Sequence, residues 1–125
     1  MTVTVAYALA GLIAGGIIFI GARFIVAPGA AAAGYGVQPD LGRRSARAYL
    51  SVKGVRDIAS GVVVLILMAA GATQLLGCVV LAATIIPIAD AIIVLGNGGR
   101  KSIALGIHGL TAAVMLLTSA LLLMT

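Results

Sequence analysis

Residues 3–27 read VTVAYALAGLIAGGIIFIGARFIVA, and this stretch decides the class of fold because Arg23 is its only charged residue. A helix needs about 20 predominantly apolar residues to cross the hydrocarbon core of a bilayer. The run is longer than the roughly 7–15 apolar residues of a signal peptide core, and no basic segment precedes it. We therefore expect it to be retained as a transmembrane helix.

The rest of the chain has the same character. Hydrophobic residues make up 62% of the 125 residues and charged residues 9%, and the mean hydropathy is +1.26. A soluble domain carries about 25% charged residues, and one of this size cannot bury so much apolar side chain. We expect a single transmembrane domain over residues 1–125, and no nucleic-acid binding, because the basic residues behind the net charge of +5 adjoin the apolar stretches.

Proline, glycine and aspartate divide the chain into four spans. Pro28 ends the first because proline interrupts the helical hydrogen-bond ladder, and Asp40 is expected to cap the second. Residues 28–39 are expected to form an apolar loop lying on the interface. The predicted fold is all-α, an integral membrane four-helix bundle. Its spans are residues 3–27, 41–70, 75–96 and 101–124.

The basic residues outside the apolar stretches predict the orientation. Arg43, Arg44 and Arg47 lie in the first two turns of the second span, which should reach into the headgroup region beside the first connection, and Arg100 and Lys101 lie where the fourth span begins. The hairpin at residues 71–74 and both termini carry none. The positive-inside rule places both basic connections in the cytoplasm and both termini on the non-cytoplasmic side. We expect a multi-pass protein of the cell membrane, most simply the bacterial cytoplasmic membrane, with membrane lipids as its surroundings.

Small residues are expected to bring the helices together, since lipid provides no hydrophobic drive for their association. Gly11 and Gly15 form a GxxxG pair with Gly16 beside it. We interpret this pair as a contact within the bundle, and a homo-oligomer through glycine-rich helix faces is the alternative. Cys78 is the only cysteine, so it cannot form an intrachain disulfide, and we expect it to be buried in the third span.

A layer of charge is predicted within the membrane. Only sixteen uncharged residues separate Asp57 from the following turn, about 24 Å of helix against a hydrocarbon core of roughly 30 Å. Similar depth estimates place other ionisable residues of the spans in the same cytoplasmic half. Intramembrane charge is rare without a partner or a function. The members of this layer are Arg23, Arg56, Asp57, Asp90 and His108.

Helical spacing predicts which side chains share a face. A polar stripe on the second span should point into the bundle, away from lipid. We expect Asp57 to pair with Arg23 and Asp90 with Arg56, with the partners exchangeable, and Lys53 to extend to the interface. The stripe consists of Tyr49, Lys53, Arg56, Asp57 and Ser60.

Two interpretations of this layer go beyond an ion-pair network that holds the helices together. The first is a pocket that binds a lipid-like or small apolar ligand with a polar head, with Tyr35 and Tyr49 as interfacial anchors or as a lid and hydroxyl donor. The alternative is a membrane-embedded acid–base enzyme of the isomerase, cyclase or epoxide-opening type, with Asp57 or Asp90 and His108 as catalytic residues. A proton-linked carrier would require oligomerisation. The candidate ligand-binding residues are Arg23, Tyr35, Tyr49, Lys53, Arg56, Asp57, Asp90 and His108.

We predict no metal and no cofactor. One histidine and two separated aspartates do not supply the three or four ligands of zinc. The chain has no phosphate-binding loop, dinucleotide fingerprint or GxSxG elbow. These residues leave open whether the protein is an enzyme.

Five short segments together carry a resemblance. They are FIVAP at 24–28, GYG at 34–36, VKGVRDIASG at 52–61, IPIAD at 86–90 and LGIHG at 105–109. The combination resembles a family of small four-helix membrane proteins of bacteria and fungi, catalogued as a domain of unknown function (number 4267), and is more distantly similar to the DoxX-like membrane proteins. The resemblance implies a fold and a set of motif residues without implying an activity. The residues implied are Lys53, Arg56, Asp57, Asp90 and His108.

Overall fold

The computed structural model describes residues 1–125 and contains helices but no strands, so the all-α prediction is confirmed. The elements are α1 (Thr2–Val26), α2 (Pro28–Tyr35), α3 (Arg44–Ala69), α4 (Thr73–Ala83), α5 (Ile85–Gly96), α6 (Lys101–Ile103), the π-helical turn η1 (Ala104–Gly109) and α7 (Leu110–Leu123).

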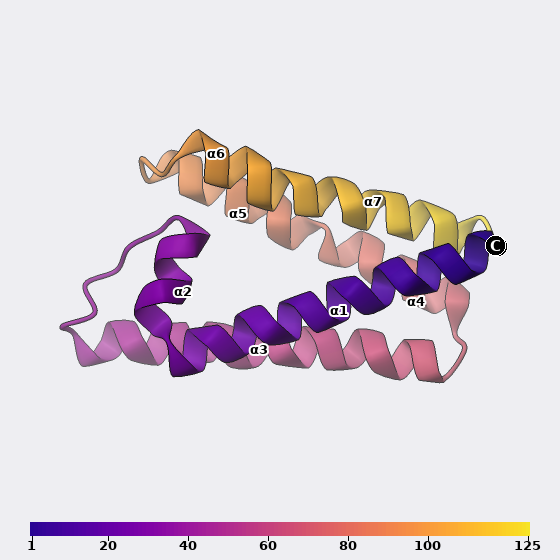
Figure 1. The fold of residues 1–125 in the computed structure, drawn as a ribbon, viewed down its shortest axis with the longest axis horizontal. Coiled ribbons are helices and arrows are strands. Elements are labelled where there is room, and N and C mark those ends of the chain that lie inside the picture. The colour runs from indigo at the N-terminus through magenta and orange to yellow at the C-terminus, as the bar shows by residue number, and fades with distance from the viewer.

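The long helices form two pairs, and the pairs diverge from one end of the molecule to the other (Figure 1). In one pair α1 packs along α3, and in the other α4 and α5 run beside α6, η1 and α7. The pairs meet at the end that holds both termini, where α1 also contacts α7. At the opposite end the short helix α2 lies between them (Figure 1).

Three helical segments are long and apolar enough to cross a membrane, namely Thr2–Val26, Thr73–Gly96 and Lys101–Leu123. The helix α3 has a comparable length of 26 residues but carries charged side chains near its middle. Only 24 of the 125 residues are buried, and large apolar side chains are exposed along every long helix. Such an exterior suits lipid rather than water as the surrounding solvent.

The main apolar core lies at the end of the molecule that holds the termini. The side chains that α1 contributes to this core are alanines, whose small size lets α1, α3, α4 and α7 pack closely together. The Tyr7 hydroxyl hydrogen bonds Thr73 Oγ1 at 2.8 Å and ties α1 to the start of α4. The core residues are Ala6, Ala10, Ala14, Val64, Leu76, Val80, Met115 and Leu122.

Glycine does join α1 to α3, but the closest contacts lie outside the predicted GxxxG pair. A Cβ atom on Gly21 would lie 2.5 Å from the Gly54 carbonyl oxygen, and one on Gly54 would lie 2.5 Å from the Gly21 carbonyl oxygen. Gly61 meets the carbonyl oxygen of Ala14 in the same way. Gly15 has no such neighbour within 4 Å. A Cβ atom on Gly11 would lie 3.5 Å from Met68 Cε of α3, an ordinary contact. Gly11 therefore does contact its neighbour within the bundle, whereas the close approach of α1 and α3 occurs at Gly21, Gly54 and Gly61 rather than at Gly15.

The segment before α3 departs from the prediction in two ways. Residues 28–35 were expected to be a loop but form α2, because Pro28 occupies the first turn, where no N–H is needed, and alanines follow. Gly36, with φ 103°, ends that helix. Asp40 does not cap α3, because it accepts a hydrogen bond from the backbone N–H of Gly42 at 3.0 Å in a local turn. Arg43 is the residue that precedes α3.

The third and fourth predicted spans both contain a local irregularity. The helix over residues 73–96 is interrupted at Thr84, because Pro87 lacks the N–H that would bond one turn back. The helix over residues 101–123 widens into the π-helical turn η1, which contains His108 and was not predicted. Cys78, expected to be buried, is exposed on α4.

Candidate functional site

An ion pair within α3 forms the centre of the polar cluster. Lys53 Nζ donates a hydrogen bond to Asp57 Oδ2 at 2.7 Å, and the two residues are one helical turn apart. The Asp57 side chain is 12% exposed and the Lys53 side chain 28%. A buried carboxylate needs such a partner because hydrocarbon cannot solvate it. The predicted pairing of Asp57 with Arg23 was wrong, because a lysine on the same helix already occupies that position.

Two aromatic rings also hold the Lys53 ammonium in place. Lys53 Nζ lies 4.7 Å from the centre of the Phe24 ring and 4.8 Å from the centre of the Tyr35 ring. Both distances suit a cation–π contact. The two rings touch edge to face, 5.9 Å apart. The Lys53 head therefore lies among α1, α2 and its own helix.

His108 connects the turn η1 to the end of α2. Its Nε2 atom lies 2.8 Å from the backbone carbonyl oxygen of Tyr35. A carbonyl oxygen can only accept, so Nε2 carries a proton and donates it. The His108 ring also packs edge to face on the Tyr35 ring, 4.7 Å away. His108 thus positions Tyr35 as well as facing the charged layer.

Asp90 lies on the other side of His108. Its Oδ2 atom is 3.9 Å from His108 Nδ1, which is too long for a direct hydrogen bond. The expected pairing of Asp90 with Arg56 does not form. Its carboxylate faces the histidine and the phenol of Tyr35 instead.

The Tyr35 hydroxyl keeps its proton in this setting. Burial raises the pKa of the Tyr35 phenol well above its usual range, and interaction with the carboxylates of Asp90 and Asp57 raises it further. The phenol is therefore a fixed hydrogen-bond donor beside Asp90.

A cavity of about 370 Å³ opens between α3 and α5, next to these groups. The stripe predicted on α3 lines one wall, and α5 and Tyr35 line the others. The lining residues are Tyr35, Tyr49, Val52, Lys53, Arg56, Asp57, Ser60, Ile86 and Asp90.

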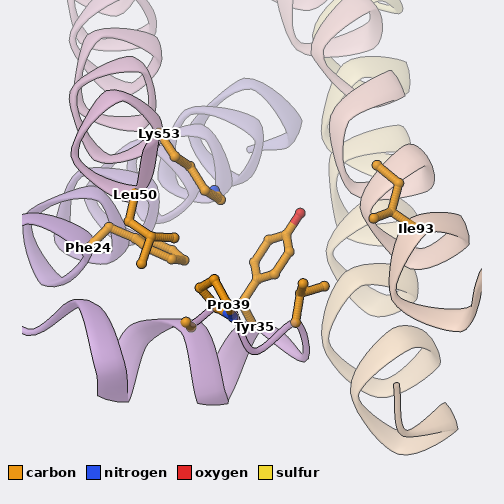
Figure 2. Close-up of a pocket in the computed structure, with 8 residues that line it drawn as sticks. Phe24, Tyr35, Pro39, Leu50, Lys53 and Ile93 are labelled. Atoms are coloured by element: carbon orange, nitrogen blue, oxygen red, sulfur yellow. The ribbon is translucent and has the colours of Figure 1, made fainter. Parts of the chain in front are cut away.

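A smaller pocket of about 200 Å³ adjoins it and is almost wholly apolar. Figure 2 shows Lys53 pointing towards the Tyr35 ring, with Phe24 and Leu50 beside it and Ile93 across the opening. Tyr35 and Lys53 line both spaces. The larger, polar cavity and the smaller, apolar pocket therefore share two lining groups, the Tyr35 phenol and the Lys53 ammonium.

The two arginines of the predicted layer behave differently from each other. Arg56 lines the larger cavity without any ion pair. Arg23 lines neither space. Its neighbours Gly21 and Phe24 are the buried residues of this part of α1.

Sequence reasoning missed part of the cluster. Phe24, whose ring contacts the Lys53 ammonium, and the backbone carbonyl of Tyr35, which accepts from His108, were not among the predicted site groups. Tyr49, 77% exposed, lies at the rim of the cavity.

No group of three or more His, Cys, Asp or Glu side chains lies close enough together to hold a metal ion.

Comparison with known proteins identifies the family of the chain but assigns no activity to it. A search of curated proteins and a search of solved structures returned no match, and the more distant resemblance to DoxX-like proteins stays a prediction. The family model described as a domain of unknown function (DUF4267) matches residues 14–122, which is most of the chain and includes every charged member of the cluster. The chain belongs to the DUF4267 family.

Proposed function

We propose that the chain is a multi-pass membrane protein in which α3 is a fourth span, with both termini on the non-cytoplasmic side. The termini and the hairpin before α4 lie at one end of the molecule, and the basic connections lie at the other (Figure 1). The positive-inside rule places the basic end in the cytoplasm. Lys53 and Asp57 neutralise each other, which lowers the cost of placing α3 in the bilayer.

Labelling of single cysteines tests this orientation. In a Cys78→Ala background expressed in a bacterial cytoplasmic membrane, a membrane-impermeant maleimide added from outside should label Thr2→Cys and leave Ser102→Cys unlabelled until the membrane is permeabilised. Both positions are exposed, so access depends on the side of the membrane. The reverse pattern, or labelling of both positions from the same side, would contradict four spans in this orientation.

We further propose that the larger cavity binds an amphipathic ligand, with its polar head against α3 and its apolar part against the adjoining pocket. The observation that carries this proposal is Arg56, a cation that lines the cavity and has no counter-charge. An unpaired arginine bordering hydrocarbon is costly unless a ligand or water meets it. Arginine also suits recognition of carboxylate and phosphate groups.

Native mass spectrometry of the protein purified in mild detergent tests ligand binding. Wild type should retain a bound molecule, and Arg56→Gln should reduce its occupancy by roughly tenfold, since each 1.4 kcal/mol of lost affinity is a factor of ten. The matched control is Arg23→Gln, which removes a membrane-depth arginine outside both pockets. Equal loss in the two variants would assign the effect to general charge, and no bound molecule in wild type would refute ligand binding.

The alternative of acid–base catalysis draws on Asp90, which faces both His108 Nδ1 and the Tyr35 phenol. Native mass spectrometry of the purified protein also distinguishes catalysis from ligand binding. An enzyme should co-purify with substrate and product, and folded Asp90→Asn should hold the substrate alone, whereas a binding protein holds one species in both forms.

A further inference from the structure

The larger cavity is lined by two cations and two carboxylates, but only one cation and one carboxylate are in contact with each other. Lys53 and Arg56 are the cations, and Asp57 and Asp90 are the carboxylates. Lys53 and Asp57 satisfy each other at 2.7 Å. This leaves one positive group, Arg56, and one negative group, Asp90, in a site with no net charge.

His108 makes no direct hydrogen bond to Asp90. The Nε2–H of His108 is committed to the Tyr35 carbonyl oxygen at 2.8 Å, which leaves Nδ1 as the ring nitrogen that faces Asp90. That atom is 3.9 Å from the carboxylate and donates nothing to it. The phenol of Tyr35 supplies only an uncharged hydrogen-bond donor.

Arg56 and Asp90 also stand on different walls. Arg56 comes from α3 and Asp90 from α5, and the cavity lies between these helices. A purely anionic head would meet Arg56 and leave the Asp90 carboxylate facing a like charge. A purely cationic head would meet Asp90 and leave the Arg56 guanidinium facing a like charge. A group with both charges satisfies both walls, which is the usual form of electrostatic complementarity.

We propose that the cavity takes the head of a zwitterionic phospholipid, with the phosphate against Arg56 and the amine against Asp90. This inference rests on the proposed function and names the ligand class of the same site. A lipid rather than a free zwitterion is indicated by the apolar pocket beside the cavity, whose lining includes Val37, Leu50 and Ile93. A length of acyl chain next to the head fits such a surface.

Lipid competition tests the proposal. The purified protein is exchanged into an equimolar mixture of phosphatidylethanolamine and phosphatidylglycerol with identical acyl chains, and retained lipids are counted by native mass spectrometry. Wild type should retain phosphatidylethanolamine over phosphatidylglycerol by roughly tenfold (1.4 kcal/mol). Asp90→Asn leaves the cavity with one excess positive charge and should reverse the preference. The matched control is Asp40→Asn, which removes an exposed carboxylate outside the cavity and should leave the preference unchanged.

Several outcomes would overturn the inference. Equal retention of both lipids by wild type, or an equal loss of both in folded Asp90→Asn, would exclude recognition of the amine. Displacement of the lipid by free glycerophosphoethanolamine would show that a soluble zwitterion is the ligand. If Asp90→Asn does not fold, Arg56→Lys must keep phosphatidylethanolamine and Arg56→Gln must lose it. A wild-type protein that holds no molecule at all would refute the proposed function itself, which is a different result.

Discussion

Gly54→Ala should lower the free energy of unfolding by about 1–3 kcal/mol, the usual cost of overpacking a close contact. The new Cβ atom would lie 2.5 Å from the Gly21 carbonyl oxygen and 2.8 Å from Ile25 Cγ1. The nearer of these atoms belongs to the backbone, so the clash is relieved only if α1 and α3 move apart. Such a movement would also separate Phe24 on α1 from Lys53 on α3. The measurement is unfolding in detergent micelles followed by circular dichroism.

Gly15→Ala is the matched control, because it makes the same chemical change on the same pair of helices. No atom lies within 4 Å of a Cβ at that position, and alanine is favoured over glycine in a helix by about 0.8–1.0 kcal/mol. We expect unchanged or slightly higher stability. Equal destabilisation by the two substitutions would mean that the close contact between α1 and α3 does not exist. Stabilisation by Gly54→Ala would mean the same.

Lys53→Met should destabilise the protein by about 3 kcal/mol, the lower end of the range for breaking a buried ion pair. The substitution keeps the apolar stem but leaves the Asp57 carboxylate, 12% exposed, without a counter-charge. The lower end applies because Asp57 lines an open cavity and is not fully buried. Asp57→Asn should cost less, because the Lys53 ammonium keeps its contacts with the rings of Phe24 and Tyr35.

A double variant and a neighbouring residue provide the controls. Lys53→Met combined with Asp57→Leu removes both charges and should recover most of the lost stability, because an apolar replacement of a buried pair is often neutral. Arg56→Met, three residues further along α3 and unpaired, should change stability by less than about 0.5 kcal/mol. If the double variant is no more stable than Lys53→Met, the two residues are not coupled.

Some features of the candidate site could be predicted from single residues. The 3.6-residue period of α3 places Lys53, Asp57 and Ser60 on one face whatever the neighbouring helices do, and all three line the same cavity. Membrane depth likewise depends on the position of a residue within its own apolar run. Asp90 and His108 therefore fall at a similar level before any contact between their helices is known.

Ion-pair partners could not be predicted in this way. Arg23 and Asp57 are at similar depth, but depth does not say how far each helix is rotated about its axis. Gly21 and Gly54 set that rotation by bringing two backbones together, and Arg23 makes no ion pair with Asp57. The i, i+4 pair of Lys53 and Asp57 needed no such information and was available from the sequence.

The sequence by itself determined that the protein is helical, that its helices are long and apolar enough to cross a membrane and that its ionisable groups gather near one end, because each of these properties depends on one residue and its neighbours along the chain. Only the tertiary structure decided which charges meet, that α2 lies between the diverging pairs (Figure 1), and that Arg56 and Asp90 line the same cavity from different helices without pairing with each other. These features depend on the relative rotation and separation of helices, which are set by close contacts between backbones from distant parts of the chain.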